Sequence, residues 1–287
     1  MNGAQAGLLA DGRRLHLQHG PIDLIIEAFG PSKEISAAYK QARVRFETLL
    51  AELVVELYDL RKPAKERRAE VHGATAARMI DAVWPHRETF VTPMAAVAGS
   101  VADEVMEALI IGRSLEKAYV NNSGDIAVYL TPGATLKLGI VGNLFQPQLD
   151  GKAEFTFDRP VRGVATSGWQ GRSWSFGIAD AVTVLAISAA AADVAATLIA
   201  NAVDVDHPAI ERSPASREDD QTELGERLVT VNVGDLDFES LEVALKRGMT
   251  EAKRMLDSGL IIAAVLVLKN EIRTVGNVPA ALIKTVN

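Results

Sequence analysis

The most informative polar residues of this sequence lie four positions apart in an alanine-rich segment. Asp193, Thr197 and Asn201 interrupt the run AADVAATLIAN at 191–201. Residues at this spacing share one face of a helix, so the segment predicts a polar stripe. A carboxylate and a hydroxyl one turn apart can offer hard oxygen ligands to Mg²⁺, which completes its shell with water and phosphate. The simpler alternative is that Thr197 bonds back to the carbonyl of Asp193 while Asp193 faces solvent, and the helix alone favours that alternative.

Three further clusters place polar residues among small ones. AGSVAD at 98–103 contains Gly99, which lets a ligand or another backbone approach closely. NNSGD at 121–125 consists of turn residues, so a hairpin turn is its preferred interpretation. TSGWQGRS at 166–173 combines glycines, hydroxyls and Arg172, and its backbone N–H groups could cradle a phosphate. It has neither the GxxxxGK[ST] nor the GxGxxG spacing, so on its own it is a weak indication of nucleotide binding.

Composition excludes several other kinds of site. The formal net charge of -7 and the pI near 5.4 argue against a nucleic-acid-binding surface, as does the aromatic content of 5%. The sequence has no cysteine, which excludes disulfides, thiolate catalysis and Cys-ligated zinc. The histidines show no HxxxH or HExxH spacing, and no GxSxG elbow is present. We therefore expect neither a histidine metal site nor a serine nucleophile.

Hydrophobicity patterning leads us to expect a cytoplasmic protein with no membrane partner. Hydrophobic residues make up 48% of the 287 and charged residues 23%, which is typical of a soluble protein with a sizeable core. The first residues lack the apolar core of a signal peptide. The most apolar stretch, 181–203, contains Asp193 and is dominated by alanine, so a buried strand followed by a helix fits it better than a membrane span does.

The elements that must position these clusters can be read from periodicity. Helical spacing predicts helices at 32–59, with Ser32 as cap, at 73–83, at 92–112, with Thr92 as cap, in the alanine-rich segment and at 238–256. Strands are expected around the turn at 19–21, on both sides of NNSGD, in KLGIVG and AEFTFD, on both sides of the TSGWQGRS loop and as a final pair in 260–276. The mixture predicts an α+β fold in a single domain over 1–287. Residues 61–70 are expected to be a solvated connection, and about 207–226 a flexible inserted loop.

Five segments together resemble a known family. They are HGPIDL at 19–24, AGSVAD at 98–103, NNSGD at 121–125, GVATSGWQGRSWSFGIADAVTVLA at 163–186 and ADVAAT at 192–197. In this order they resemble the UPF0280 family, an uncharacterised branch of the ApbE superfamily, whose best-known members are flavin transferases. The resemblance covers most of the chain. It implies an ApbE-like, T-fold-like α+β fold with largely antiparallel sheets packed with helices.

The resemblance also implies ligands and a reaction. Asp193 and Thr197 match an Asp and a Thr that bind Mg²⁺ in the flavin transferases, where a main-chain carbonyl helps; here that would be the carbonyl of Val97 or Ala98. The residues implied to lie along FAD, or a related dinucleotide or flavin, are Ala98, Gly99, Ser123, Gly124, Asp125, Thr166, Ser167, Gly168 and Arg172. The implied reaction is Mg²⁺-assisted cleavage of the FAD pyrophosphate, with FMN passed to a Thr or Ser of an acceptor protein. Asp193 and Thr197 would then be catalytic as well as metal-binding.

The sequence departs from the transferase pattern at three places. Ala98 replaces a Lys before the helix glycine, Ser123 replaces the first glycine of a GGD turn, and 173–177 offers no counterpart to a His downstream of the TSG loop. Three hypotheses therefore stand: a Mg²⁺-dependent flavin transferase, a cofactor-binding protein without transfer, and a cofactor-biosynthesis enzyme acting on a pterin-like or other heterocyclic substrate. A homodimer is expected only as a general default.

Overall fold

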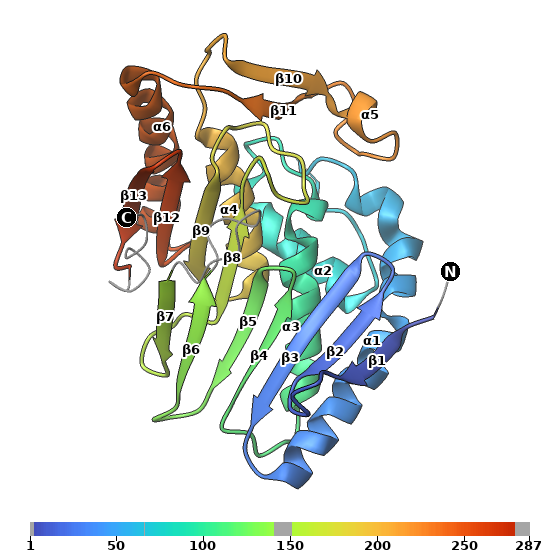
Figure 1. Ribbon diagram of the computed structural model, residues 1–287. Helices are drawn as coiled ribbons and strands as arrows, with labels where there is room; N and C mark the ends of the chain where they lie inside the picture. Colours follow the sequence, from blue (N-terminus) through green and yellow to red (C-terminus); the bar gives the residue numbers. More distant parts are fainter. Residues whose placement is uncertain (1–2, 66, 141–150, 279–287) are drawn as a thin grey trace. The chain divides into compact units, whose positions relative to one another are not determined.

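The computed structural model describes residues 3–65, 67–140 and 151–278 (Figure 1). The chain divides into two compact units. Unit 1 comprises Met1–Leu136, Phe155–Ala165 and Ala186–Val194, and unit 2 comprises Lys137–Glu154, Thr166–Leu185 and Ala195–Asn287. Each unit is thus built from separate stretches of sequence. The single domain expected over 1–287 stays a prediction.

Unit 1 contains an antiparallel sheet with the strand order β1-β2-β3-β4-β5-β8. Its strands are β1 (Gln5–Leu8), β2 (Leu15–His19), β3 (Ile22–Phe29), β4 (Lys117–Asn122), β5 (Asp125–Leu130) and β8 (Gly163–Ser167). The last two residues of β8, Thr166 and Ser167, already belong to unit 2. Successive side chains of a strand point to opposite faces, so alternate apolar residues reach the core. Leu15 and Leu17 of β2 and Ile22, Leu24 and Ile26 of β3 are buried in this way.

Three helices complete the core of unit 1. They are α1 (Ser32–Leu60), α2 (Ala74–Val83) and α3 (Val97–Ile110), and the 3₁₀ helices η1 (Trp84–His86) and η2 (Pro93–Ala96) lie between α2 and α3. The buried residues of α1 recur at helical spacing, at Ala38, Ala42, Phe46, Leu49 and Leu53. Helices α1 and α3 contact each other and the strands of this sheet, which they cover on one face (Figure 1).

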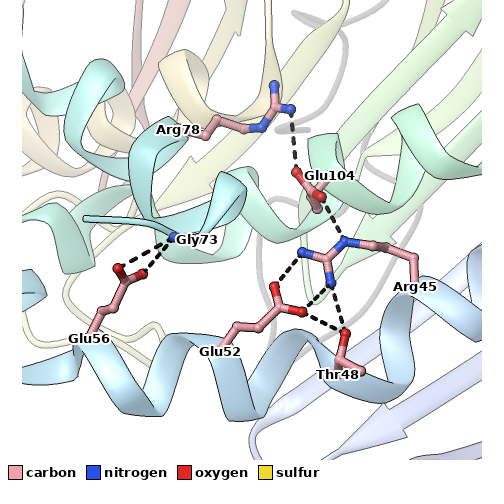
Figure 2. Close-up of polar contacts among 7 residues, drawn as sticks. All are labelled: Arg45, Thr48, Glu52, Glu56, Gly73, Arg78 and Glu104. Carbon is pink, nitrogen blue, oxygen red and sulfur yellow. Dashed lines mark hydrogen bonds and ion pairs between the residues drawn. The ribbon is translucent and has the colours of Figure 1, made fainter.

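A network of charged side chains joins the three helices of unit 1 (Figure 2). Arg45 of α1 donates to Glu52 of the same helix and to Glu104 of α3, each at 2.7 Å. Glu104 is only 8% exposed and also accepts from Arg78 of α2 at 3.5 Å. A buried carboxylate needs a close cation, so this network explains how Glu104 is accommodated in a largely apolar interface.

Unit 2 contains a second antiparallel arrangement, in the order β9-β12-β13. Its strands are β9 (Ala181–Ala186), β12 (Ala263–Leu268) and β13 (Glu271–Gly276), and α6 (Phe238–Asp257) contacts β12 and β13. Strands β9 and β12 are apolar along nearly their whole length because both faces are buried. Strands β10 (Ile210–Pro214) and β11 (Leu228–Val233) form a separate pair, with α5 (Ala215–Glu218) between them.

The remaining elements continue from one unit into the other along the chain. Strands β6 (Thr135–Ile140) and β7 (Gly151–Thr156) pair with each other. Helix α4 (Ala189–Ala202) is the predicted alanine-rich helix. In the described part of the chain, no helix is both long and apolar enough to cross a membrane.

The predicted α+β class with largely antiparallel sheets is confirmed, and so are the helices and strand pairs in the segments expected to contain them. Three details were wrong. Pro31, not Ser32, is the N-cap residue of α1. The predicted helix at 92–112 begins as η2, because Pro93 starts a tight turn there, and α3 begins only at Val97. The segment expected to be a loop at 207–226 contains β10 and α5.

The error at β10 has a simple physical cause. Its sequence IERSP is polar, since neither face is deeply buried, and only backbone pairing with β11 makes it a strand. Such a strand has no apolar alternation to reveal it. Within the predicted strand KLGIVG, Val141 and Gly142 lie outside the described residues.

Candidate functional site

The N-terminus of α4 is held by α3. The first-turn N–H groups of a helix have no partner inside it and need other acceptors. Asp103 of α3 accepts the N–H of Ala189 at 3.0 Å through Oδ1 and that of Ala190 at 2.9 Å through Oδ2. Ser188 supplies acceptors for the next two N–H groups, through its hydroxyl and its carbonyl. The first turn of α4 is therefore fully satisfied.

Asp193 of α4 in turn holds the N-terminus of α3. Its Oδ2 accepts the N–H of Gly99 at 2.9 Å, and its carboxylate also accepts from the N–H of Ala98. Both N–H groups belong to the first turn of α3, because that helix begins at Val97. Asp193 thus caps α3 while Asp103 caps α4.

Glycine makes this arrangement possible. A Cβ at Gly99 would overlap the backbone of Ala189 and Ala190, and a Cβ at Gly163 would overlap that of Ser188. The first turn of α4 is therefore packed against backbone from both α3 and β8. The prediction that Gly99 permits close approach is confirmed for a second backbone.

The charge of Asp103 influences the protonation of Asp193. Burial raises the pKa of Asp193 to about 7, the negative charge of Asp103 adds to this, and the two N–H donors oppose it. Burial also raises the pKa of Asp103, against the N–H groups of Ala190 and Ala189. A divalent cation beside Asp193 would offset the cost of its negative charge.

The donor set suits a cation that needs few protein ligands. Among the described residues, no group of three or more His, Cys, Asp or Glu side chains gathers in a metal-binding arrangement. Thr197 is half-buried, one turn beyond Asp193 on α4. The hard oxygens of Asp193 and Thr197 fit Mg²⁺, which tolerates a shell made mostly of water and phosphate.

The helix alone favoured an interpretation in which Thr197 bonds back to the carbonyl of Asp193 while Asp193 faces solvent. This interpretation is wrong. In the part of the chain that the structure describes, the hydroxyl of Thr197 makes no hydrogen bond, whereas Thr250 on α6 bonds back to the carbonyl of Lys246 at 2.8 Å. Asp193 does not simply face solvent either, since it caps α3. The carbonyl of Ala98, a candidate third ligand, accepts from Asn122 at 3.0 Å, so part of its acceptor capacity is already used.

The NNSGD segment forms the predicted hairpin turn. Ser123 and Gly124 both have positive φ, 55° and 115°, and connect β4 to β5, with Asp125 as the first residue of β5. The N–H of Gly124 donates to Asn121 Oδ1 at 2.8 Å. Because the adjacent Asn122 is buried and bonds to Ala98, this turn is fixed to the start of α3 within unit 1.

The TSGWQGRS loop lies in unit 2 and is held largely by Asp180. Thr166 and Thr183 share a hydrogen bond between their hydroxyls at 2.9 Å, and a Cβ at Gly168 would overlap the carbonyl of Asp180. Asp180 accepts from Trp169 Nε1 at 3.1 Å and from the N–H of Lys269. Ser167 is half-buried and Arg172 is exposed. Gly168 and the hydroxyl of Thr166 therefore both have structural partners in unit 2.

Asn201, which the sequence left unexplained, has a clear role in unit 2. Its Oδ1 accepts the hydroxyl of Ser175 at 3.1 Å and the N–H of Phe176 at 2.9 Å. A Cβ at Gly177 would overlap the carbonyl of Ala200, so the segment passes directly against α4. The sequence shows this segment as SFG at 175–177, but no residue near it predicts a contact with Asn201.

The predicted site residues divide between the two units. Unit 1 brings together Asp193, Ala98 and Gly99 and attaches the Ser123–Gly124 turn to them through Asn122. The predicted residues in unit 2 are Thr166, Ser167, Gly168, Arg172 and Thr197. The roles of all these residues toward a cofactor stay predictions.

Comparison with known proteins places the chain in a family. The model of the family described as AbpE bacteria matches residues 6–274. The chain belongs to this family. This chain is 38% identical over 127 residues to a UPF0280 protein of Methanothermobacter thermautotrophicus. The aligned region covers 41% of this chain and 45% of the relative. A UPF0280 protein of Methanopyrus kandleri is 34% identical over 143 residues, covering 49% and 56%. The predicted resemblance to the UPF0280 family is confirmed, and the chain spans about half the length of these relatives.

Solved structures offer a more distant comparison for the AbpE-family chain. The flavinyl transferase ApbE of Pseudomonas stutzeri in its apo form is 14% identical, with a TM-score of 0.43 over 95% of this chain and 93% of that one. The flavin transferase ApbE of Vibrio cholerae is 13% identical, with a TM-score of 0.45 over 98% and 99%.

Proposed function

We propose that this AbpE-family protein binds a pyrophosphate-containing cofactor, FAD or a related flavin, together with Mg²⁺ held by Asp193 and Thr197. The observation that carries the proposal is the environment of Asp193. Its carboxylate is fixed at the first turn of α3, and its charge is disfavoured by burial and by Asp103. A carboxylate held in place but costly to ionise is a good ligand for a cation that repays that cost on binding.

The residues present have the capacity that this role requires. An ionised carboxylate has about four acceptor positions, and the N–H groups of Ala98 and Gly99 use two of them. These N–H groups orient the carboxylate, and Thr197 adds a hydroxyl from the next turn of the same helix. When bound, Mg²⁺ would neutralise charge on the phosphate oxygens of the cofactor.

Transfer of FMN from FAD to a Thr or Ser of an acceptor protein is the activity inferred from the resemblance. Binding without transfer is the second candidate, and Ser175 favours it. It lies in the segment where the resemblance leads one to expect a His, and its hydroxyl is engaged with Asn201 and with the N–H of Gly177. Ser175 thus has a structural role there and, as a hydroxyl, does not substitute for an imidazole as a proton carrier at neutral pH.

Titration of FAD with and without MgCl₂, followed by flavin fluorescence, tests the binding proposal. We expect saturable binding that depends on Mg²⁺, that is lost in Asp193→Ala and that is retained in Asp206→Ala, an exposed acid on the loop after α4. If the wild-type protein does not bind FAD in the presence of Mg²⁺, the proposal is wrong.

A second experiment separates transfer from binding. The protein is incubated with FAD, MgCl₂ and a panel of purified candidate acceptor proteins, and intact masses are measured. A mass increase equal to one FMN on an acceptor supports transfer. FAD binding with no such increase across the panel, including the protein itself, supports the second candidate.

A further inference from the structure

We propose that Asp103 is a positioning residue for Asp193, so that the two carboxylates and the two helix starts form one cooperative unit. Its role toward a metal rests on the function proposed above, whereas the geometry does not depend on that function. Asp103 lies outside the predicted ligand set.

The contacts form a closed circuit within unit 1. Asp103 of α3 holds the N–H groups of Ala189 and Ala190 at the start of α4. Asp193, in the next turn of α4, holds the N–H groups of Ala98 and Gly99 at the start of α3. In each helix the carboxylate follows, by about one turn, the N–H groups that the other carboxylate accepts. A shift of either helix start therefore moves the carboxylate that caps the other.

Water cannot readily replace Asp103. Ala189 and Ala190 are 0% and 2% exposed, and backbone at Gly99 and Gly163 closes over this turn. Without the carboxylate of Asp103, a buried N–H would lose its acceptor, which is costly enough to move the first turn of α4. The carboxylate of Asp193 would then leave the place where the N–H of Gly99 holds it.

Asp103→Asn is the diagnostic substitution. It keeps the shape of the side chain but leaves one acceptor oxygen in place of two, so Ala189 and Ala190 cannot both be satisfied. Glu56→Gln is the matched control. Glu56 of α1 accepts the N–H groups of His72 and Gly73, which immediately precede α2, so a carboxylate of another helix holds this segment as well; the Gly73 contact is drawn in Figure 2.

Two measurements on the folded proteins test the proposal. With MgCl₂ alone in isothermal titration calorimetry, D103N should bind Mg²⁺ about 10- to 100-fold more weakly than wild type, the range usual for residues that orient metal ligands. In metal-free hydrogen exchange, D103N should speed exchange of the Gly99 amide, whose side-chain acceptor is Asp193 and not Asp103. E56Q should change neither quantity.

Each outcome decides a separate question. Unchanged exchange at Gly99 in folded D103N, with unchanged Mg²⁺ affinity, would overturn the positioning role. If wild type binds no Mg²⁺, the proposed function fails, and Gly99 exchange alone then decides whether Asp103 positions Asp193. If D103N does not fold, Asp103→Glu is measured in its place, since it keeps the charge and displaces the carboxylate by one methylene. The same faster Gly99 exchange is expected, and its absence overturns the proposal.

Discussion

Asp193 and Asp103 lie on different helices, and each accepts N–H groups from the first turn of the helix that carries the other. The positive end of a helix dipole favours a nearby carboxylate, which explains why two acids can lie close together in a partly buried setting. Burial nevertheless raises the pKa of both. Hydrogen bonds from the two helix starts therefore hold both carboxylates in place, whereas desolvation disfavours their charged forms. Substitutions test the first effect and pH dependence tests the second.

The pair should make stability depend on pH in metal-free buffer. The pKa of Asp193 rises from 3.8 to about 7 on folding, so between these values the folded protein holds a proton that the unfolded chain releases. The free energy of unfolding should thus fall as pH rises from about 4 to about 7, by up to about 1.4 kcal/mol per pH unit. Asp103 and Asp180, whose pKa values are also raised, add in the same direction. Urea denaturation in EDTA at a series of pH values measures this slope.

Asp193→Asn is the control for that slope. It removes the ionisation while keeping the side-chain shape, so its stability should decline less steeply over the same pH window. Added Mg²⁺ should stabilise wild type more at pH 8 than at pH 5, because metal and proton compete for the carboxylate. Equal slopes for wild type and D193N would contradict the assignment of the pH dependence to Asp193.

Gly99→Ala should destabilise the protein severely. The new Cβ would overlap the backbone of Ala189 and Ala190, and backbone cannot rotate away as a side chain can. We expect a loss of at least about 3 kcal/mol in the free energy of unfolding. Gly7→Ala on β1 is the control, because nothing lies within 4 Å of a Cβ there. Thermal unfolding by circular dichroism compares the two variants, and a similar loss in both would count against the close approach of α3 and α4.

Asn201→Ala should weaken the attachment of the SFG segment in unit 2. The hydroxyl of Ser175 and the N–H of Phe176 would lose their shared acceptor, at a cost of about 1–3 kcal/mol. Asn232→Ala removes an exposed amide that donates to Glu211 at 2.9 Å, and it should cost less than about 0.5 kcal/mol. Urea denaturation followed by tryptophan fluorescence distinguishes them, and equal midpoints would contradict the structural role of Asn201.

The network around Glu104 allows a comparison of two neighbouring arginines. Arg45→Met would leave the buried Glu104 with Arg78, at 3.5 Å, as its one cationic partner among the described residues, and should cost about 3–5 kcal/mol. Arg43→Met breaks an exposed pair with Glu47 at 3.4 Å and should cost less than about 1 kcal/mol. Denaturant midpoints for the two variants check the difference, and similar values would mean that burial of Glu104 has little energetic consequence.

Periodicity predicted much of this fold but not the contacts that organise the site. Helix α4 and the β4–β5 hairpin follow from local spacing and turn residues, which a sequence displays directly. The capping contacts between helices do not follow from local spacing, because Gly99 and Asp193 are 94 positions apart and no residue near either one specifies the other. Periodicity predicts a helix that begins near Thr92, whereas α3 begins at Val97 after η2. The sequence therefore does not reveal that the N–H groups of Ala98 and Gly99 lie in a first turn and need acceptors from outside the helix.

Thr197 offers the sharpest test of the proposed metal site. Since its hydroxyl makes no hydrogen bond among the described residues, Thr197→Val should leave the free energy of unfolding nearly unchanged. If Thr197 binds the metal, the same substitution should weaken Mg²⁺ binding, and Thr197→Ser should largely restore it, because serine keeps the oxygen. Thr250→Val on α6 is the matched control and should leave Mg²⁺ affinity unaltered. Calorimetry with MgCl₂ on the three variants decides the point: unaltered affinity in T197V would leave Asp193 without this neighbour as a co-ligand.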